Sequence, residues 1–317
     1  MIRLYDFEFN LLHIEPRCIS TRWTLYFNDV GTLEAHFLPD EEIVRLILEK
    51  KYLVIEEKGK FAIITGYVMQ ENFTVYGRTC NWLLSKRAVN KFDKITGTAD
   101  SITRGIVNTA FADVDNFALG NPLEITETIE FSKDSSALTS DVVTECLKLQ
   151  NCGHRLEFDV ENKRWLYCTI QSRQNNLILS AANKNAYGIE FSHDLLDLAD
   201  CGYYEKKVKN TDSNSETAVT TYLSDENTKT GIYRWEAILT GSEESEAANN
   251  LKSKAAKDEV TLSTRNVKYG DDYALGDILR VQIIKNGLRS NVKKRVSGVE
   301  IVHRSGSCSE QPIFEEV

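Results

Sequence analysis

The run from Tyr187 to Glu236 decides the fold class of this chain. It opens with Tyr187-Gly188-Ile189-Glu190-Phe191-Ser192 and closes with Gly231-Ile232-Tyr233-Arg234-Trp235-Glu236. Apolar and polar residues alternate in both pieces, and the apolar positions are mostly β-branched or aromatic, which is typical of half-buried strands. Between them, Asn210 to Asn227 is rich in Ser, Thr, Asn and Asp, so we expect a long polar excursion off a sheet. The pattern predicts a β-rich assembly module.

Size, composition and charge are those of an ordinary globular protein. The chain has 317 residues, of which 42% are hydrophobic and 27% are charged, and this length suggests about two domains. Its net charge is −9. Binding to a phosphate backbone needs clustered Lys and Arg, so we expect no specific binding to nucleic acid.

The beginning of the sequence carries no targeting signal. Acidic Asp6 follows Met1 within a few residues, where a signal peptide would need an apolar stretch. No apolar run approaches the roughly 18 residues that cross a bilayer, so we expect no membrane anchor. The sequence therefore predicts a soluble protein made in the cytosol.

The chain divides by pattern into four sections, and the predicted fold class is α+β and β-rich, with two small barrel-like β modules and helical insertions. Residues 1–95 form the first barrel-like module, residues 96–172 a mixed α+β insert, residues 173–304 a second β module with a long surface helix, and residues 305–317 a loose C-terminal tail.

Four helices are expected within these sections. They cover residues 40–51 with Asp40 as N-cap, residues 100–112 capped by Asp100 or Ser101, residues 138–151, and residues 243–260. Strands are expected at 17–27, 32–37 and 123–131, among others, and a hairpin joins 154–159 to 164–170.

The sequence contains none of the common catalytic signatures, such as His-Glu-x-x-His, Gly-x-Ser-x-Gly or a Walker loop. The five histidines are scattered, and no two of the seven cysteines form a Cys-x-x-Cys pair. We therefore predict reduced, mostly buried thiols and assign no catalytic, cofactor-binding or metal-binding residue. The histidines are at 13, 36, 154, 193 and 303; the cysteines are at 18, 80, 146, 152, 168, 201 and 308.

Three local patterns imitate reactive sites. Asp113-Val114-Asp115-Asn116 resembles a calcium loop, but Phe117 stands where an oxygen ligand is needed. Ser192-His193-Asp194 resembles a triad, but neighbouring residues of a strand point to opposite faces. Glu41-Glu42 and Glu243-Glu244 resemble the carboxylate pairs of glycosidases, but each stands at a helix start, which the helix dipole favours.

The four tryptophans, at 23, 82, 165 and 235, are spread along the chain. Their default role is to anchor the core. The alternative for some of them is a subunit interface, because aromatic side chains often anchor buried contacts between chains.

Several pieces, taken in order, resemble the tail hub or baseplate hub proteins of phages that infect Gram-positive bacteria and of related phage-like particles. The early pieces are Tyr5-Asp6, Arg22-Trp23, Gly31-Thr32-Leu33-Glu34, Phe37-Leu38-Pro39, Gly66, Gly77-Arg78, Leu83-Leu84 and Arg87. The late pieces are Ile189-Glu190-Phe191-Ser192, Leu198 to Tyr204, Gly231 to Glu236 and Tyr273-Ala274-Leu275-Gly276-Asp277.

This resemblance implies a homotrimeric hub that adapts a sixfold tail tube to a threefold tip, assembled in the bacterial cytoplasm and located at the virion tail tip. The implied partners are a distal tail or tail tube protein, a tape measure protein, and a spike or fibre. DNA would pass through the channel without specific binding. The family supplies no catalytic motif, so we expect no enzyme, and a lytic or receptor-binding domain is not expected before Val317.

Two alternatives from other classes stay open. One is a tail-associated hydrolase of the cell wall, which needs a pocket with paired carboxylates or a Cys/His pair. The other is a tail protein that binds glycans on the host surface.

Overall fold

The computed structural model describes all of residues 1–317 except 40, 210–215, 225–227, 242–243, 286 and 305. It divides into two compact units. The large unit contains residues 1–189 and 261–315, and the small unit contains residues 190–260. The divisions fall within β16 (Ala186–Asp194) and β20 (Lys257–Thr264), two strands that pair with each other. The predicted sections follow the chain order, whereas the large unit is discontinuous in sequence.

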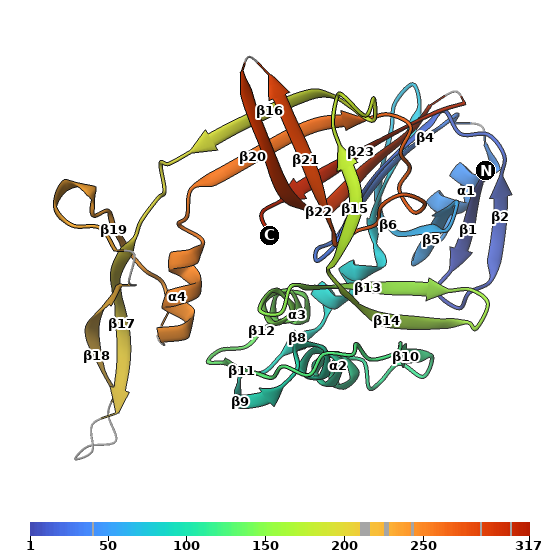
Figure 1. Ribbon diagram of the computed structural model, residues 1–317. Coiled ribbons are helices and arrows are strands. Elements are labelled where there is room, and N and C mark those ends of the chain that lie inside the picture. The colour runs from blue at the N-terminus through green and yellow to red at the C-terminus, as the bar shows by residue number, and fades with distance from the viewer. Residues whose placement is uncertain (40, 210–215, 225–227, 242–243, 286, 305) are drawn as a thin grey trace. The chain divides into compact units, whose positions relative to one another are not determined.

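An eleven-stranded sheet organises the large unit (Figure 1). Its order is β15-β21-β22-β3-β4-β7-β6-β5-β1-β2, and β23 pairs with β22 beside this path. The strands are β1 (Ile2–Asp6), β2 (Leu11–Glu15), β3 (Ser20–Tyr26), β4 (Thr32–Phe37), β5 (Leu53–Glu57), β6 (Lys60–Met69), β7 (Phe73–Thr79), β15 (Arg173–Leu179), β21 (Asp277–Lys285), β22 (Leu288–Arg304) and β23 (Ser307–Glu315).

The β-rich α+β class is confirmed, but among the described residues the strand pairing does not close a barrel. Among the described residues the sheet runs from β15 at one end to β2 at the other, and strands from both predicted modules share it. The reason is the antiparallel pairing of β22 with β3, which places Ile301 opposite Trp23. Strands that the sequence pattern assigned to two separate modules therefore share one sheet and one hydrophobic core.

One core lies between this sheet and α1 (Glu42–Glu49). In β4 the buried residues Leu33, Ala35 and Phe37 alternate with half-buried ones, as the sequence predicted. The helix adds Ile43 and Ile47 to the same core, which confirms its predicted apolar face. The proposed N-cap, residue 40, lies outside the described residues, and Glu41 at the N-cap position makes no side-chain capping bond.

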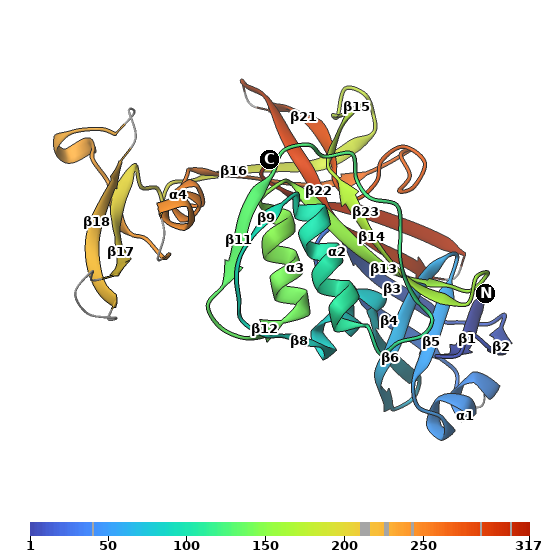
Figure 2. The same ribbon diagram turned by 90° about the horizontal axis from the view of Figure 1, so that it is seen from below.

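A second core of the large unit surrounds two helices that pack side by side (Figure 2). They are α2 (Ala99–Ala110) and α3 (Thr139–Lys148), close to their predicted positions. The hairpin of β13 and β14 is confirmed. The other elements here are η1 (Cys80–Lys86), β8 (Ala88–Val89), β9 (Phe92–Gly97), β10 (Phe117–Leu119), β11 (Ile129–Lys133), β12 (Ala137–Leu138), β13 (Cys152–Asp159) and β14 (Arg164–Gln171).

The cap of α2 differs from the prediction. Thr98, and neither Asp100 nor Ser101, occupies the N-cap, and its side chain accepts a hydrogen bond from the Ser101 amide at 3.0 Å. Asp100 is instead buried, where its carboxylate accepts hydrogen bonds from the Leu123 amide and the Thr169 hydroxyl. Asp100, which the sequence suggested as a possible cap, therefore ties α2 to the segments that contain Leu123 and Thr169.

In the small unit, β17 (Cys201–Lys209) pairs antiparallel with β18 (Glu216–Ser224) and parallel with β19 (Glu236–Ile238). The short helix η2 (Gly231–Tyr233) precedes β19, and α4 (Glu244–Lys252) packs against the sheet. The core is small, with Tyr204, Leu239 and Ala247 buried.

The prediction for the run from Tyr187 to Glu236 is therefore only partly confirmed. Its first piece is a strand, as predicted, but residues 231–233 form a 3-10 helix and the strand begins only at Glu236. The predicted excursion contains β18, because its Thr, Val and Tyr residues suit a strand paired on one side. The remainder of that prediction, at 210–215 and 225–227, lies outside the described residues.

Three further expectations were wrong. The helix predicted at 243–260 ends at Lys252, and residues 257–264 form β20 instead; residue 243 lies outside the described residues. The strand predicted at 123–131 begins only at Ile129. Residues 307–315, expected to be loose, form β23, because β22 supplies a complete row of backbone partners.

Phe27 packs against two other segments of the large unit, one at Gly153 and His154 and one at Gly276. Its ring is buried, and its carbonyl oxygen accepts a hydrogen bond from the His154 amide at 3.0 Å. A Cβ placed at Gly276 would lie 2.4 Å from the Phe27 ring, and one at Gly153 would lie 2.2 Å from the Phe27 oxygen. Both glycines are therefore required by close packing, and Gly276 also has a φ of +86°.

This packing predicts that Gly276→Ala destabilises the protein far more than Gly287→Ala. Both positions have a φ of +86°, but nothing lies within 4 Å of a Cβ at Gly287. The backbone strain of about 1 kcal/mol should be common to both variants, and the clash with Phe27 should add about 2 kcal/mol at Gly276. Denaturant unfolding measures both. Equal losses of stability would contradict this account of the junction.

Acid should weaken the fold through His154. Burial lowers the pKa of its imidazole to about 4, against about 6.5 in an unfolded chain. Below pH 6.5 the unfolded chain binds a proton that the folded chain does not, so stability falls by about 3 kcal/mol on approaching pH 4. Unfolding of the parent and of His154→Gln, measured from pH 7 to pH 4, should show a flatter dependence in the variant. Parallel curves would contradict it.

Candidate functional site

The residues that imitate reactive sites are held in ordinary structural contacts. The carboxylate that His193 contacts belongs to Asp258 on β20, whose oxygen lies 2.7 Å from the Nδ1 atom, and not to the adjacent Asp194. Asp113 pairs with Arg87 at 3.0 Å. Glu42 is exposed and pairs with Arg45. Of the second carboxylate pair, residue 243 lies outside the described residues. His193, Asp113 and Glu42 thus each pair with a residue outside the pattern that suggested a reactive site.

The other histidines and the cysteines also have structural surroundings. His13 contacts Glu15, His36 contacts Glu34, and the buried His154 contacts the Asn28 side chain. All seven thiols are free, and Cys80, Cys146, Cys152 and Cys201 are buried, as predicted for most of them. In the part of the chain that the structure describes, no group of three or more His, Cys, Asp or Glu side chains is placed to hold a metal ion.

The tryptophans separate into two kinds. Trp23 and Trp165 are buried in the two cores, and Trp82 packs partly buried beside the second, as expected for anchors. Trp235, in the small unit, is 43% exposed. Of the four tryptophans, Trp235 is therefore the candidate for the alternative role, an anchor of a subunit interface.

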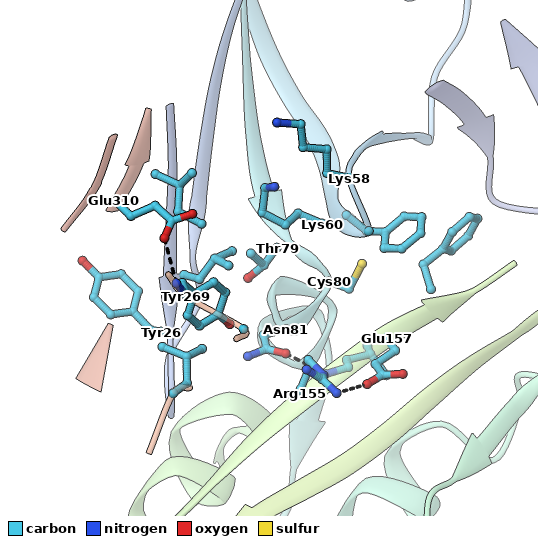
Figure 3. A pocket seen from close by; sticks show the side chains of 18 of the residues that line it. Tyr26, Lys58, Lys60, Thr79, Cys80, Asn81, Arg155, Glu157, Tyr269 and Glu310 are labelled. Atoms are coloured by element: carbon cyan, nitrogen blue, oxygen red, sulfur yellow. Dashed lines mark hydrogen bonds and ion pairs between the residues drawn. The ribbon is translucent and has the colours of Figure 1, made fainter. Parts of the chain in front are cut away.

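One cavity in the large unit has the size and lining of a binding site (Figure 3). Its volume is about 600 Å³. Lys58 and Lys60 reach it from the hairpin of β5 and β6, and Tyr26, Tyr269 and Glu310 stand across from them in Figure 3. We call this cavity the lysine pocket. Its apolar lining includes Leu25, Phe61, Leu275 and Ile301.

A buried hydrogen-bond cluster lies behind the lysine pocket. The Oε2 atom of Glu57 accepts from the Trp23 indole at 2.7 Å and from the Thr21 hydroxyl at 2.8 Å. The Nδ1 atom of His303 lies 3.1 Å from the same oxygen. Burial lowers the pKa of the His303 imidazole. These contacts fix the His303 ring, whose Nε2 atom lies 3.2 Å from Lys58 Nζ.

The acidic groups of the lysine pocket are already engaged. Glu310 accepts a hydrogen bond from the Tyr269 amide at 2.7 Å. Glu157 forms an ion pair with Arg155. Among the described residues, neither Lys58 nor Lys60 has a carboxylate within ion-pair distance, and Lys60 Nζ lies 5.7 Å from the centroid of the Trp23 ring. The pocket therefore carries charges of both signs, because the hydrogen bond from the neutral Tyr269 amide leaves the negative charge of Glu310 in place near the two ammonium groups.

The small unit exposes a row of apolar side chains on one face of its sheet. The register places Tyr203 opposite Tyr222 on one side and opposite Ile238 on the other, and the two tyrosine rings lie 4.9 Å apart. Ile238 is 82% exposed, and each tyrosine is about 40% exposed. The opposite face carries Tyr204 and packs on α4. We call this set the apolar row. An exposed contiguous row of this kind marks a contact surface.

The apolar row belongs to an acidic unit. Residues 190–260 contain fifteen Asp and Glu against eight Lys and Arg, a balance of −7 within the −9 of the chain. The edge strand β18 adds to the surface, because among the described residues it pairs only with β17. An unprotected edge of this length is a site where another strand can add.

Neither surface was identified from the sequence. The lysine pocket is built from side chains of several distant segments, and the only local signal was the turn that begins at Lys58-Gly59. The apolar row depends on the register of three strands, of which one was expected to be loop.

Comparison with known proteins identifies the fold. No known protein-family model matches the sequence, and no curated protein matches it. Solved structures are similar over nearly the whole chain. The 43 kDa tail protein of prophage MuSo2 from Shewanella oneidensis has a TM-score of 0.63 at 10% identity, covering 99% of this chain and 98% of its own.

Two further structures extend the similarity. The prophage tail protein gp18 from Listeria monocytogenes has a TM-score of 0.61 at 10% identity, covering 99% of this chain and 93% of its own. The E. coli c3393 protein is described as a type VI secretion component with structural similarity to the T4 tail proteins gp27 and gp5. Its TM-score is 0.51 at 10% identity, covering 100% of this chain and 77% of its own. The chain thus has the fold of tail-hub-like proteins. None of the helices within the described residues is long and apolar enough to span a membrane.

Thiol labelling should report access to the lysine pocket. Cys308 lines the pocket and is exposed, whereas Cys80, Cys146, Cys152 and Cys201 are buried. We expect one rapidly reacting thiol per native chain and its loss in Cys308→Ser. Burial and then Glu310 raise the pKa of the Cys308 thiol, so its labelling should still accelerate above pH 9. Mass spectrometry after maleimide treatment measures this. Unchanged rapid labelling of Cys308→Ser would show that another thiol is open.

Proposed function

We propose that this chain is a structural protein of a phage tail or of a tail-derived machine, and that it forms a homotrimeric hub at the tail tip or baseplate. The observation that carries the proposal is the extent of the structural similarity. It covers 99% of this chain and almost all of two prophage tail proteins, rather than one shared domain. A fold can host many functions, so the surfaces of this chain must support the role independently.

The apolar row supplies that support. The small unit buries few apolar side chains, yet it exposes Ile238, Tyr203 and Tyr222 on one face and leaves the edge of β18 unpaired among the described residues. A structural protein of an assembly buries such surfaces against its neighbours, whereas an isolated protein would be prone to aggregate through them. The exposed Trp235 fits the same role.

The trimer follows from the symmetry that the tail requires. A sixfold tube can join a threefold tip if each of three chains contributes two similar positions. The two β-rich sections at 1–95 and 173–304, which flank the mixed section at 96–172 and contribute strands to one sheet, are our proposed basis for this arrangement. The partners we propose are a distal tail or tail tube protein, a tape measure protein, and a spike or fibre. An association with Gram-positive hosts is part of the proposal.

The negative charge of the chain suits a channel for DNA. A surface balance of −9 repels a phosphate backbone, so DNA can pass without being retained. We also propose that the chain is not an enzyme, because its candidate reactive residues lie in separate structural contacts. The competing proposals are a cell-wall hydrolase and a glycan-binding tail protein.

Sedimentation should give a mass of three chains of 36.0 kDa, about 108 kDa. Copies of a chain with net charge −9 repel one another, so the trimer fraction should rise between about 0.05 and 0.5 M salt as screening increases. Sedimentation across protein concentrations measures both effects. A strict monomer at about 100 μM in 0.5 M salt would contradict the homotrimer.

Zymography tests the role itself. The purified chain should leave Gram-positive cell walls intact, and clearing of the walls would contradict the structural proposal in favour of a hydrolase. Saturable binding to purified cell-wall glycans by the monomeric chain would favour the glycan-binding alternative.

A further inference from the structure

The hairpin of β21 and β22 has a one-sided charge that the proposed tail role does not explain. From Ile278 to Val299 the sequence contains no Asp or Glu, although the whole chain has 47 acidic against 38 basic residues. The same stretch contains six basic residues: Arg280, Lys285, Arg289, Lys293, Lys294 and Arg295. Blocks of like charge are typical of segments that interact with an oppositely charged partner.

The outer part of this hairpin extends beyond the rest of the sheet, at the top of Figure 1. The pairing of β15 with β21 ends at Val281. The pairings of β22 with β23 and β3 begin only at Arg295 and Gly298. Among the described residues, the outer part of the hairpin therefore has no third strand, and we call it the arm.

One face of the arm is exposed and basic. The register of β21 with β22 places three opposed pairs on this face, and we call the set the basic face. The pairs are Arg280 with Lys293, Gln282 with Asn291, and Ile284 with Arg289. All six except Gln282 are exposed, and Ile284 is 57% exposed. The opposite face differs, because Val281 and Ile283 are buried.

The cations of the basic face lack a partner within the chain. Among the described residues, no carboxylate lies within ion-pair distance of Arg280, Arg289 or Lys293. Exposed cations elsewhere on the sheet differ; Arg22, for example, pairs with Glu300 at 2.7 Å. Directly opposed like charges, such as Arg280 and Lys293, weaken a strand pair. The fold therefore keeps a small unfavourable interaction that an acidic partner would relieve.

The acidic groups beside the hairpin are balanced by cations of their own. Asp277, at the start of β21, lies 2.8 Å from Arg173. Glu315, on β23, lies 3.1 Å from Arg295. The adjacent strand β15 carries no acidic residue. These carboxylates therefore do not cancel the positive charge of the basic face.

The apolar residue on the basic face indicates the kind of partner. Ile284 is exposed beside Arg289, and a protein interface buries such a side chain while charged groups surround it. A phosphate backbone offers no apolar group to cover Ile284, and a chain with net charge −9 repels it. A protein segment can place carboxylates against the cations and an apolar side chain against Ile284.

We propose that the basic face docks an extended acidic segment of another protein. Carboxylates of this segment pair with Arg280, Lys293 and Arg289, and an apolar side chain covers Ile284. From Arg280 to Ile284 the strand rises roughly 14 Å, so the outermost carboxylates of the segment stand at least about four residues apart. The face lies within one chain and the partner is a different protein, so the proposal does not depend on the homotrimer.

Two blocked peptides test the basic face by methyl NMR on the full chain labelled at isoleucine. One is Glu-Thr-Glu-Thr-Leu-Thr-Glu, whose Glu and Leu side chains share one face when it is extended, and the other has Gln in place of each Glu. The Glu peptide should shift the Ile284 signal with a Kd of about 1 mM or lower, and the Gln peptide should bind at least about 10-fold more weakly. The affinity of the Glu peptide should fall as salt rises.

The same spectra contain an internal control. Ile284→Val assigns the Ile284 signal, and the signal of Ile95 on β9, which is 40% exposed, should not shift. Equal affinities of the two peptides, or no shift of Ile284 at about 5 mM Glu peptide, would overturn the proposal.

Substitutions that remove equal charge locate the contact. Arg280→Gln combined with Lys293→Gln should weaken the Glu peptide at least about 10-fold. Lys50→Gln combined with Lys51→Gln removes the same two charges from an exposed site after α1 and should leave the affinity unchanged. Equal weakening by the two double variants would show that net charge attracts the peptide, and would overturn the assignment to the basic face.

Thermal unfolding checks that the cations are not structural. Because Arg280 and Lys293 repel each other, their double variant should unfold at the same temperature as the parent or at a higher one. A lower unfolding temperature would overturn the claim that they lack a partner. Arg289→Gln, at the outer end of the face, provides a second variant, which should also weaken the Glu peptide.

Two further measurements separate other occupants. The Arg280→Gln and Lys293→Gln double variant should self-associate like the parent in sedimentation, and loss of self-association would overturn the proposal in favour of a second copy. Duplex DNA should not shift the Ile284 signal at concentrations where the Glu peptide does. A shift by DNA at lower concentrations would overturn the proposal in favour of nucleic acid.

Discussion

The pairing of β22 with β3 is the interaction on which the large unit depends. It places Gly298 opposite Tyr26 and Arg304 opposite Ser20, and so joins strands almost 280 residues apart. Ordering so long an intervening chain costs entropy, and the burial of Trp23, Val299 and Ile301 in one core offsets that cost. Without this pairing the first strands would lose their neighbour, and β21, β23 and β15 would lose their connection to the sheet. The lysine pocket depends on it too, because Tyr26 and Ile301 line the pocket from these two strands.

Sequence patterns predicted the elements that local chemistry specifies. The strand at Thr32–Phe37 and the helix at Ala99–Ala110 each bury one regular face, so their periodicity is visible without knowing the neighbours. Elements specified by their neighbours were missed. β18 is polar enough to resemble a loop, and β23 has little apolar pattern of its own. Both are strands because an adjacent strand supplies a full row of hydrogen-bond partners. The helix predicted to reach residue 260 failed for a related reason, since β16 recruits residues 257–264 as a strand.

The candidate surfaces were harder still to predict. Lys58 and Lys60 can be recognised in the sequence as the tip of a hairpin, but the fold is needed to show that Glu310 and Tyr269, more than 200 residues later, line the same pocket. The apolar row likewise arises from register: a shift of one residue between β17 and β19 would move Ile238 to the opposite face. The argument against a relay of Ser192, His193 and Asp194 needs only the sequence, because neighbouring residues of one strand point to opposite faces.

The seam between β16 and β20 has a consequence for how such chains diversify. The chain leaves the large unit at residue 189 and returns at residue 261, and both crossings lie in strands that pair with each other. The Arg265 amide, for example, donates to the Asn185 carbonyl at 3.0 Å. An inserted segment whose two ends meet in this way can be exchanged for a longer, shorter or unrelated one while its host keeps its own hydrophobic interior. Residues 190–260 thus form a segment that can be replaced as one unit, either in evolution or by grafting in chimaeric proteins.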